Sequence, residues 1–264
     1  MVITQLWIYP IKSCKGIAVS SIDLLESGLR YDREMMIVDD ETGKFVTQRS
    51  DKILAHIEVS LPDEESVQLT FNKRSIIFKK QYIQTQAVDT TVWRRDVPAF
   101  DQGDEVACFL SQIIGRNVRL LATRPVDTLN AQKNILFQDG QAVHLLTESS
   151  LNHAQQALSD YQIDTQRFRP NIVIGKSEPN EILEAFSEDN WKKVSTEQID
   201  LTITKLCERC AIPSINPQTL DKERAVDHYL KQYRMIDKKP MFGVCGYSSK
   251  LGTLNIGDTI IVTA

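Results

Sequence analysis

Residues 142–158 read AVHLLTESSLNHAQQAL, a stretch that joins two kinds of element. Its apolar run ends at a Thr-Glu-Ser-Ser turn, after which Leu151, Ala154 and Leu158 recur at helical spacing. This pattern predicts a strand, a cap and a helix. The helix start, from Thr147 to Ser150, is also a natural anion site, because first-turn amides have no partner within the helix. Simple N-capping is the commoner role of such residues, so both interpretations remain open here.

The chain before this stretch consists mainly of short β-like segments. Apolar and polar residues alternate in residues 2–9, and further runs rich in Val, Ile and Phe are separated by turn clusters at residues 40–43 and 62–65. This pattern predicts a β meander over the first hundred residues. A first helix is expected at residues 104–114, where an acidic start, helical spacing and Gly115 as a stop coincide.

More β structure is expected after residue 158. Residues 168–175 (FRPNIVIG) and 199–206 (IDLTITKL) predict strands, and residues 222–232 predict an amphipathic helix. Residues 251–263 (LGTLNIGDTIIVT) predict a closing hairpin around Gly257 and Asp258. The chain is therefore expected to be a strand-rich α+β protein.

A polar segment from about residue 125 to residue 141 is the place where a domain boundary is expected. It predicts a first domain of residues 1–124 and a second of residues 125–264. No repeat or low-complexity tract is visible in the sequence.

Composition and charge exclude several classes of protein. The chain has 264 residues, 42% of them hydrophobic, and a formal net charge of −4, so it can bury a sizeable core and lacks the basic balance of a nucleic-acid binder. Its first residues show neither a signal peptide nor a membrane span, which predicts a cytoplasmic protein with no membrane partner. The five cysteines are an odd number, so we expect reduced thiols rather than structural disulfides.

Residues 205–217 read KLCERCAIPSINP and place Cys207 and Cys210 three positions apart. A zinc site needs two more ligands at metal spacing, which the sequence does not offer. A thioredoxin-like dithiol needs a helix after the pair, which Pro213 and Pro217 prevent. Two buried thiols remain a plain structural alternative. The guanidinium of Arg209 instead favours a thiolate, the form that binds a soft metal.

Three further stretches carry groups that bind anions. Residues 9–16 (YPIKSCKG) supply Lys12 and Ser13 on a turn, and residues 28–34 (GLRYDRE) supply Arg33. Arg169 stands just before a predicted strand, so its side chain is expected at the mouth of that strand. Solvated surface residues and local ion pairs are the alternative for each stretch taken alone.

Six motifs in a fixed order carry a resemblance to a known family. They are YPIKSCKG, GLRYDREMMIVD, LLTESSL, RFRPNIVI, CERC and the closing MFGVCGY with GTLNIGD. In this order the chain resembles MOSC-domain proteins with an N-terminal MOSC β-barrel region, and in particular the amidoxime-reducing components and their bacterial relatives. The resemblance covers nearly the whole chain.

The resemblance implies an N-terminal MOSC-type mixed β region packed on a C-terminal MOSC β-barrel with a few helices. It also implies the molybdenum cofactor, a pyranopterin dithiolene (molybdopterin) with a terminal phosphate, whose metal is completed by one protein cysteine. Cys210 matches that metal ligand and is the implied catalytic residue, while Cys207 is expected to be a packing residue. The implied cofactor-binding residues are Lys12, Ser13 and Arg33 at the phosphate end, Thr147, Ser150, Arg169 and Asn171 at the pterin, and Arg209 beside the ligand.

The family's reaction is the two-electron reduction of N-hydroxylated compounds, such as amidoximes, hydroxylamines and N-hydroxylated base analogues, to amines. Some bacterial relatives carry a ferredoxin domain with four clustered cysteines after the MOSC domain, and this sequence shows no such cluster. We therefore expect a separate electron donor, a reductase or a ferredoxin-like protein. Glu208 and Cys245 depart from the family pattern, which leaves the shape of the substrate pocket open.

Two other functions compete with the enzyme. One is a non-catalytic carrier of the molybdenum cofactor or of persulfide sulfur. MOSC domains fused to a cysteine-desulfurase-like region, which binds pyridoxal phosphate, resemble such systems, but no such region is expected here. The other is a β-barrel interaction module with incidental thiols, which leaves the order of the six motifs unexplained.

Overall fold

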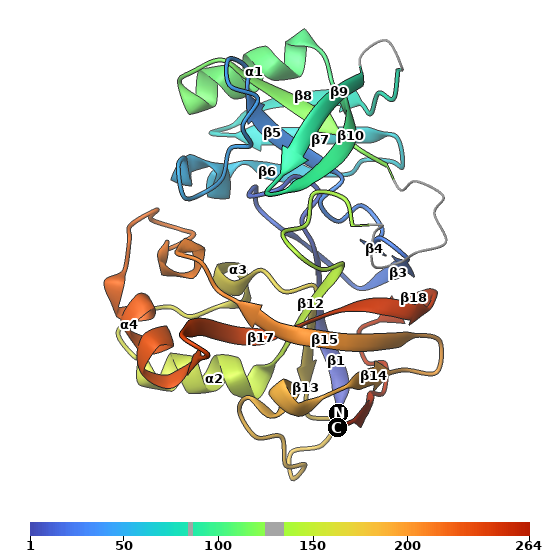
Figure 1. Cartoon of the computed structure of the whole chain (residues 1–264), viewed down its shortest axis with the longest axis vertical. Coiled ribbons are helices and arrows are strands. Elements are labelled where there is room, and N and C mark those ends of the chain that lie inside the picture. Colours follow the sequence, from blue (N-terminus) through green and yellow to red (C-terminus); the bar gives the residue numbers. More distant parts are fainter. Residues whose placement is uncertain (84–86, 125–134) are drawn as a thin grey trace.

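The computed structural model describes residues 1–83, 87–124 and 135–264 of the chain. Its elements form two lobes stacked along the long axis, and both chain ends lie toward the far end of one lobe (Figure 1). The first lobe contains β5 to β11 with helix α1, and the second contains β1 and β12 to β19 with the remaining helices. The strand-rich α+β class expected from the sequence is confirmed.

A nine-stranded sheet organises the second lobe, with the order β19-β14-β15-β17-β12-β13-β1-β2 and β16 paired to β17. Strands β12 and β13 run parallel, and the other described pairs of this sheet run antiparallel. Its strands are β1 (Val2–Ile8), β2 (Ile17–Val19), β12 (Val143–Thr147), β13 (Ile172–Gly175), β14 (Lys193–Ser195), β15 (Asp200–Glu208), β16 (Met235–Ile236), β17 (Lys239–Lys250) and β19 (Ile261–Thr263).

Three smaller sheets complete the β structure of the described residues. The order β5-β11-β10-β9 forms one sheet of the first lobe and β6-β7-β8 forms another, while β18-β3-β4 joins residues from both ends of the chain. Their strands are β3 (Ser21–Leu25), β4 (Gly28–Leu29), β5 (Met35–Asp39), β6 (Glu58–Ser60), β7 (Ser66–Phe71), β8 (Arg74–Lys79), β9 (Ala87–Val92), β10 (Arg95–Asp101), β11 (Val118–Ala122) and β18 (Gly252–Asn255).

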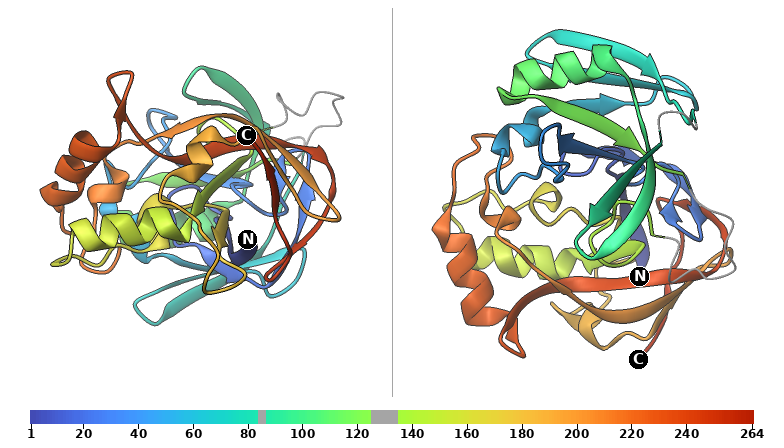
Figure 2. Two further views of the ribbon diagram at one scale, coloured as in Figure 1. Left: turned by 90° about the horizontal axis from the view of Figure 1, so that it is seen from below. Right: turned by 45° about the horizontal axis from the view of Figure 1, so that its top comes forward.

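Helices cover the flanks of both lobes, as two further views show (Figure 2). The helix expected at residues 104–114 is confirmed, since α1 ends where Gly115 takes the left-handed conformation with φ 84°. The helix expected after Thr147 is also confirmed, because the Thr147 side chain accepts a hydrogen bond from the Ser150 amide. The helices are α1 (Asp104–Ile114), α2 (Glu148–Ala157), α3 (Thr165–Phe168) and α4 (Arg224–Tyr233), with short 3₁₀ turns η1 (Lys52–His56), η3 (Ser187–Asn190) and η4 (Ile212–Ser214).

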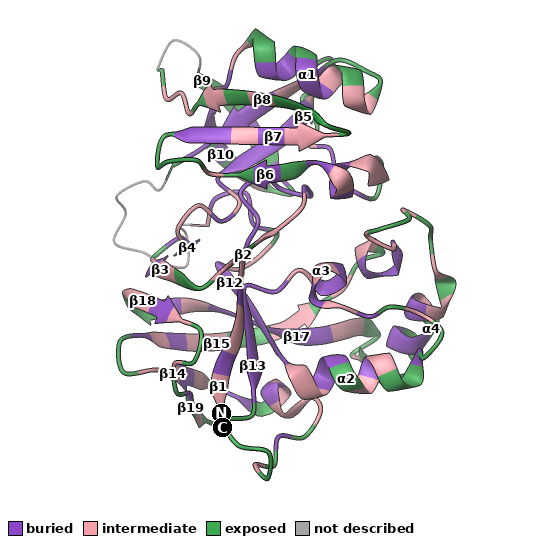
Figure 3. Cartoon of the chain, turned by 180° about the vertical axis from the view of Figure 1, so that it is seen from behind, coloured by how far each residue is buried: buried purple, intermediate pink, exposed green. Residues whose placement is uncertain are grey.

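Each lobe buries its own apolar core, seen as continuous purple along the central strands in Figure 3. Ile3, Leu145 and Val244 from three strands of the large sheet meet in the second lobe. Ile37, Leu110 and Leu120 meet in the first lobe, between its strands and α1. Two further clusters of buried residues add to these, one that contains Phe242 in the second lobe and one that contains Leu121 in the first lobe.

Two sequence predictions are corrected by the strand pairing. The first hundred residues are not one meander, because β1 pairs with β13 and β3 pairs with β18, far along the chain. The closing hairpin is absent from the described residues, since β18 pairs with β3 whereas β19 pairs with β14. The turn at Gly257 and Asp258 instead bonds to Ile3, so it leads the chain from one sheet to another.

The predicted boundary between residues 124 and 125 stays a prediction, since residues 125–134 lie outside the described residues. The strand pairing adds one fact, that β1 and β2 belong to the sheet of the second lobe. None of the helices in the described parts of the chain is long and apolar enough to cross a membrane.

Candidate functional site

A cavity of about 430 Å³ lies where the two lobes meet. Its wall contains six basic side chains, those of Lys12, Arg33, Arg49, Arg169, Lys205 and Arg209. Among the described residues, two acidic side chains line it, those of Asp139 and Glu208. Because the whole chain has a net charge of −4, this excess of positive charge is local to the cavity. Such a wall favours an anionic ligand.

The loop after β1 brings Lys12 and Ser13 to the cavity. The Lys12 ammonium donates hydrogen bonds to the Phe137 carbonyl at 2.8 Å and to Asp139 Oδ1 at 2.7 Å. Burial lowers the pKa of Lys12, although Asp139 acts to raise it. The Lys12 ammonium, together with the hydrogen bond from Trp93 and the charge of Arg33, lowers the pKa of the largely exposed Asp139 carboxyl to about 2. The predicted pair Lys12 and Ser13 is therefore part of the cavity wall.

Arg33 lines the same wall, but its terminal nitrogens already have partners. Nη1 donates to both carboxylate oxygens of Asp32, at 2.7 and 2.6 Å, and Nη2 donates to the Arg169 carbonyl at 3.2 Å. The guanidinium lies 4.3 Å from the centre of the Tyr9 ring. Arg33 therefore lines the cavity, as expected from the sequence, and also forms the ion pair that the sequence left as the alternative.

Arg169 reaches the cavity from the end of α3, where it takes the left-handed conformation with φ 54°. Its Nη1 donates to the Cys14 carbonyl at 2.8 Å, and its guanidinium lies 4.1 Å from the centre of the Tyr9 ring. Its Nη2 is buried and has no hydrogen-bond partner. Burial lowers the pKa of Arg169 to about 10. An unpaired buried guanidinium nitrogen is costly, so it is a natural contact for a bound anion.

Asn171 lines the cavity and also ties three strands together. Its Oδ1 accepts from the His144 amide at 3.1 Å, and its Nδ2 donates to the Trp7 carbonyl at 3.2 Å. Because these bonds hold the starts of β12 and β13 beside β1, Asn171 fixes the shape of the wall.

Arg209 stands at the end of β15 between the two cysteines of the CERC motif. Its Nη2 donates to the Phe168 carbonyl at 2.8 Å, and its Nη1 donates to Cys207 Sγ at 3.0 Å. Its Nε is buried without a partner. Cys210 follows on the exposed loop and lines the cavity. The sequence therefore placed Arg209 and Cys210 at one site, but the hydrogen bond of Arg209 goes to Cys207.

Cys207 is more than the packing residue expected from the sequence. It is half-buried, lines the cavity and lies close to Cys245 on β17. The pKa of Cys207 is lowered well below its usual value because the Cys245 thiol donates a hydrogen bond to it, with the charges of His144 and Arg209 adding to the effect. The CERC motif alone gives no sign of this interaction, because Cys245 and His144 lie on strands that are far from the motif in the sequence.

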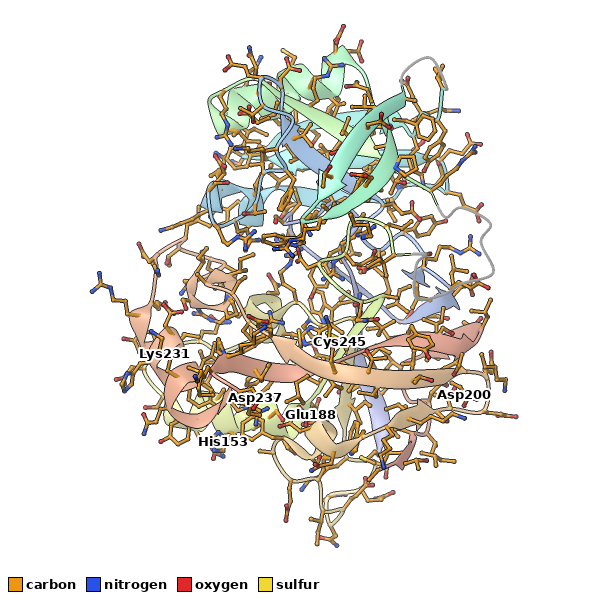
Figure 4. All side chains as sticks on the ribbon, in the orientation of Figure 1. His153, Glu188, Asp200, Lys231, Asp237 and Cys245 are labelled. Atoms are coloured by element: carbon orange, nitrogen blue, oxygen red, sulfur yellow. The ribbon has the colours of Figure 1, made fainter. Side chains whose placement is uncertain are left out.

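Thr147 and Ser150 are the two predicted cofactor contacts that the structure does not bring to the cavity. Both are fully buried, and their hydroxyls donate to the carboxylate of Glu188 at 2.9 and 2.7 Å. The cavity lies at the start of β12, where His144 lines it, whereas Thr147 stands at the opposite end of that strand. In Figure 4, Glu188 lies on the far side of the β15 and β17 ribbons from the junction that Cys245 approaches.

Burial also determines the charge state of Glu188. Burial raises the pKa of its carboxyl, although the hydrogen bonds from Ser150 and Thr147 act to lower it. Thr147 and Ser150 therefore act as a helix cap and as partners of a buried acid, which is the alternative that the sequence left open.

Arg49 and Trp93 are cavity residues that the sequence motifs missed. The guanidinium of Arg49 lies 4.8 Å from the centre of the Trp93 ring, and Trp93 Nε1 donates to Asp139 Oδ1 at 2.9 Å. Trp93 is half exposed at the turn between β9 and β10. Trp93 takes a positive φ of 59° in this turn, and no local pattern in the sequence marks it as a cavity residue.

The residues of the cavity fit an anionic group such as a pterin with a terminal phosphate. Arg169 Nη2 and Arg209 Nε are both buried donors without partners, and both belong to residues that line the cavity. Cys210 supplies a single exposed sulfur beside them. Among the described residues there is no cluster of three His, Cys, Asp or Glu side chains that could hold a metal ion.

Comparison with known proteins gives matches over nearly the whole chain. Mitochondrial amidoxime reducing component 2 of Rattus norvegicus is 26% identical over 98% of this chain and 82% of its own length. Mitochondrial amidoxime-reducing component 1 of Homo sapiens is 25% identical over the same shares. Molybdenum cofactor sulfurase of Drosophila pseudoobscura pseudoobscura is 29% identical over 98% of this chain and 35% of its own length.

A solved structure and two family models extend the comparison. The YUAD protein of Bacillus subtilis is similar at a TM-score of 0.47 and 8% identity, over 98% of this chain and 94% of that one. Residues 1–117 match the MOSC N-terminal beta barrel domain, and residues 132–261 match the MOSC domain. The chain therefore belongs to the MOSC-domain proteins that carry an N-terminal MOSC β-barrel domain.

Proposed function

We propose that this protein is a molybdenum-cofactor-dependent oxidoreductase that reduces N-hydroxylated compounds with electrons from a separate donor protein. One observation carries the proposal: two unpaired buried guanidinium nitrogens, of Arg169 and Arg209, belong to the wall of the cavity that Cys210 also lines. The names of the relatives, amidoxime-reducing components and a molybdenum cofactor sulfurase, support the same general function.

Different residues of the cavity would hold different parts of the cofactor. Cys210 would complete the coordination of the metal through its sulfur, and Arg209 Nε and Arg169 Nη2 would donate hydrogen bonds to anionic oxygens. Lys12 would add positive charge from the loop after β1, with Ser13 beside it. When bound, the cofactor supplies the two-electron redox chemistry that removes the oxygen of an N–OH group.

The protein's own contribution is orientation and access. Arg33, Tyr9 and Arg169 stack on one another, so the cations of the wall keep fixed positions before any ligand arrives. Trp93 and Arg49 stand together and are the side chains we expect a substrate to pass. A separate donor protein would deliver electrons at the cavity. The predicted location of the protein remains the cytoplasm.

Metal and pterin analysis of Cys210→Ser tests the proposal. The wild-type protein, made in a host that synthesises the cofactor, should contain molybdenum and pterin in equal amounts and should reduce benzamidoxime with a chemical reductant. Cys210→Ser should lose the metal and the activity, whereas Cys108→Ser should keep both, because Cys108 lies exposed on α1 away from the cavity. A wild-type protein without molybdenum, or a fully loaded and active Cys210→Ser, would refute the proposal.

The similarity to a molybdenum cofactor sulfurase favours one alternative, a non-catalytic carrier of the cofactor or of sulfur. The same preparation separates the two functions. Cofactor bound with turnover of benzamidoxime supports the enzyme, and cofactor bound without turnover of any N-hydroxylated compound supports the carrier.

A further inference from the structure

Two cysteines, Cys207 and Cys245, line the cavity in addition to the predicted metal ligand Cys210. Cys207 lies on β15 and Cys245 on the neighbouring antiparallel strand β17, where Cys245 pairs with Lys205. Side chains two residues apart on the same face of such a pair are diagonal neighbours within reach of each other. Both cysteines line the same cavity, and Cys245 is the neighbour that contributes most to lowering the pKa of Cys207.

The two sulfurs have different chemical character. Arg209 Nη1 donates to Cys207 Sγ at 3.0 Å, which is short for a contact to sulfur and stabilises a thiolate. Hydrogen bonding to Cys207 raises the pKa of Cys245 well above its usual value, so Cys245 keeps its proton. A thiolate next to a thiol is the arrangement in which one sulfur reacts first and the other resolves the product.

The backbone around the two cysteines departs from regular strand pairing. The register of β15 against β17 is irregular between Leu206 and Glu208, as at a β-bulge. On the partner strand, Gly243 has φ 73°, a conformation that needs a glycine. These irregularities lie near the two cysteines. A disulfide has narrow geometric limits, so its formation here requires a small movement of the strands.

We propose that Cys207 and Cys245 are an oxidative modification site, at which hydrogen peroxide converts the two thiols into a reversible disulfide in the cavity wall. The inference needs no bound cofactor and goes beyond the proposed reductase activity.

The chemistry balances with hydrogen peroxide as the oxidant. The Cys207 thiolate attacks one peroxide oxygen, the O–O bond breaks, and Cys207 becomes a sulfenic acid while hydroxide leaves. The Cys245 sulfur then attacks the Cys207 sulfur, and the sulfenic oxygen leaves as water with the proton of Cys245. One more proton turns the hydroxide into water, so two sulfurs lose two electrons and one peroxide becomes two waters.

The remaining three cysteines do not offer this arrangement. Cys14 is buried, and burial raises the pKa of its thiol to about 12. Cys108 is exposed on α1, where it accepts a hydrogen bond from Gln112. Cys210 is exposed on the loop after β15. Reaction at low peroxide should therefore favour Cys207.

Peptide mapping of the full chain tests the proposal without reference to molybdenum. The protein is made in a host that lacks the cofactor, reduced, treated with hydrogen peroxide and alkylated under denaturing conditions. We expect a cross-linked peptide that contains Cys207 and Cys245, a loss of two of the five titratable thiols, and full recovery of these thiols with dithiothreitol.

Three variants make the test specific. Cys245→Ser should accumulate a sulfenic acid at Cys207 that dimedone traps, and Cys207→Ser should give neither product. Cys108→Ser should behave like the wild type. The proposal is overturned if Cys207 and Cys245 stay alkylatable at a peroxide dose that oxidises Cys108, or if the cross-link joins Cys210 instead. Because the readout uses the cofactor-free chain, neither result depends on the proposed enzyme activity.

Discussion

Arg169 combines an unusual backbone conformation with an incomplete set of partners. Its Nη1 is bound to the Cys14 carbonyl, and its Nη2 is the buried donor that we assign to the cofactor. Arg169→Lys keeps the charge but removes the planar fork, and a lost hydrogen bond to a charged group costs about 1.5–3 kcal/mol, or about ten- to a hundredfold in affinity. Pterin content after gel filtration should fall accordingly. Arg30→Lys, at an exposed ion pair with Asp23, is the matched control and should retain the wild-type content.

The buried carboxyl of Glu188 predicts how the stability of the protein changes with pH. Burial raises the pKa of its carboxyl above the usual value of 4.5, so the folded protein holds this proton more tightly than the unfolded chain does. Stability from this group is therefore present at low pH and is lost as the pH rises through the raised pKa. Glu188→Gln, which is neutral throughout, should unfold with a flatter dependence of Tm on pH between about pH 4 and about pH 8.

The exposed carboxyl of Glu184 provides the control for this pH effect. Glu184→Gln removes one negative charge nearby without touching Thr147 or Ser150, so its Tm should follow the wild type across the same pH range. If Glu188→Gln and the wild type shared the same pH profile, the buried acid would contribute nothing to the pH dependence of stability.

Among the elements, β15 and β17 carry Cys207 and Cys245, and Gly246 on β17 pairs with Ile203 on β15. A Cβ at Gly246 would overlap the backbone carbonyl of Thr202, which no side-chain rotation can relieve. Gly246→Ala should therefore lower the free energy of unfolding by about 1–3 kcal/mol in urea titrations. Gly140→Ala is the control, because its Cβ would meet only the end of the flexible Lys205 side chain. Equal midpoints for the two variants would contradict this account.

Local elements were predictable where a short-range signal decides them. Helix α1 was predicted with its observed bounds, because Gly115 ends it through a conformation that other residues rarely adopt. Helix α4 was predicted within two residues at its start. The closing hairpin was wrong because the partners of β18 and β19 are β3 and β14, and no local pattern encodes a pairing between the two ends of the chain.

At the scale of the whole molecule, the cavity residues show the same limit: residues within a local motif were predicted, whereas contacts made by tertiary packing were not. Lys12, Arg169 and Cys210 were predicted together because each sits in a recognisable motif. Thr147 was predicted as a helix cap, and it stands at the opposite end of β12 from the cavity residue His144. Trp93 was missed because its role depends on where a turn of the first lobe meets the second lobe, which is a matter of tertiary packing.

Because both lobes contribute to the cavity, cofactor binding should stabilise the whole chain. Protein from a host that makes the cofactor should unfold at a higher Tm than protein from a host that does not, since a ligand that binds only the folded state adds about 3–4 kcal/mol at 100 to 1,000 times its Kd. For a chain of this size that corresponds to a shift of several degrees. Cys210→Ser from the competent host should melt like the cofactor-free protein, and Cys108→Ser should melt like the loaded one. Identical melting of the wild type from both hosts, with the cofactor bound in one of them, would mean that the ligand does not join the lobes.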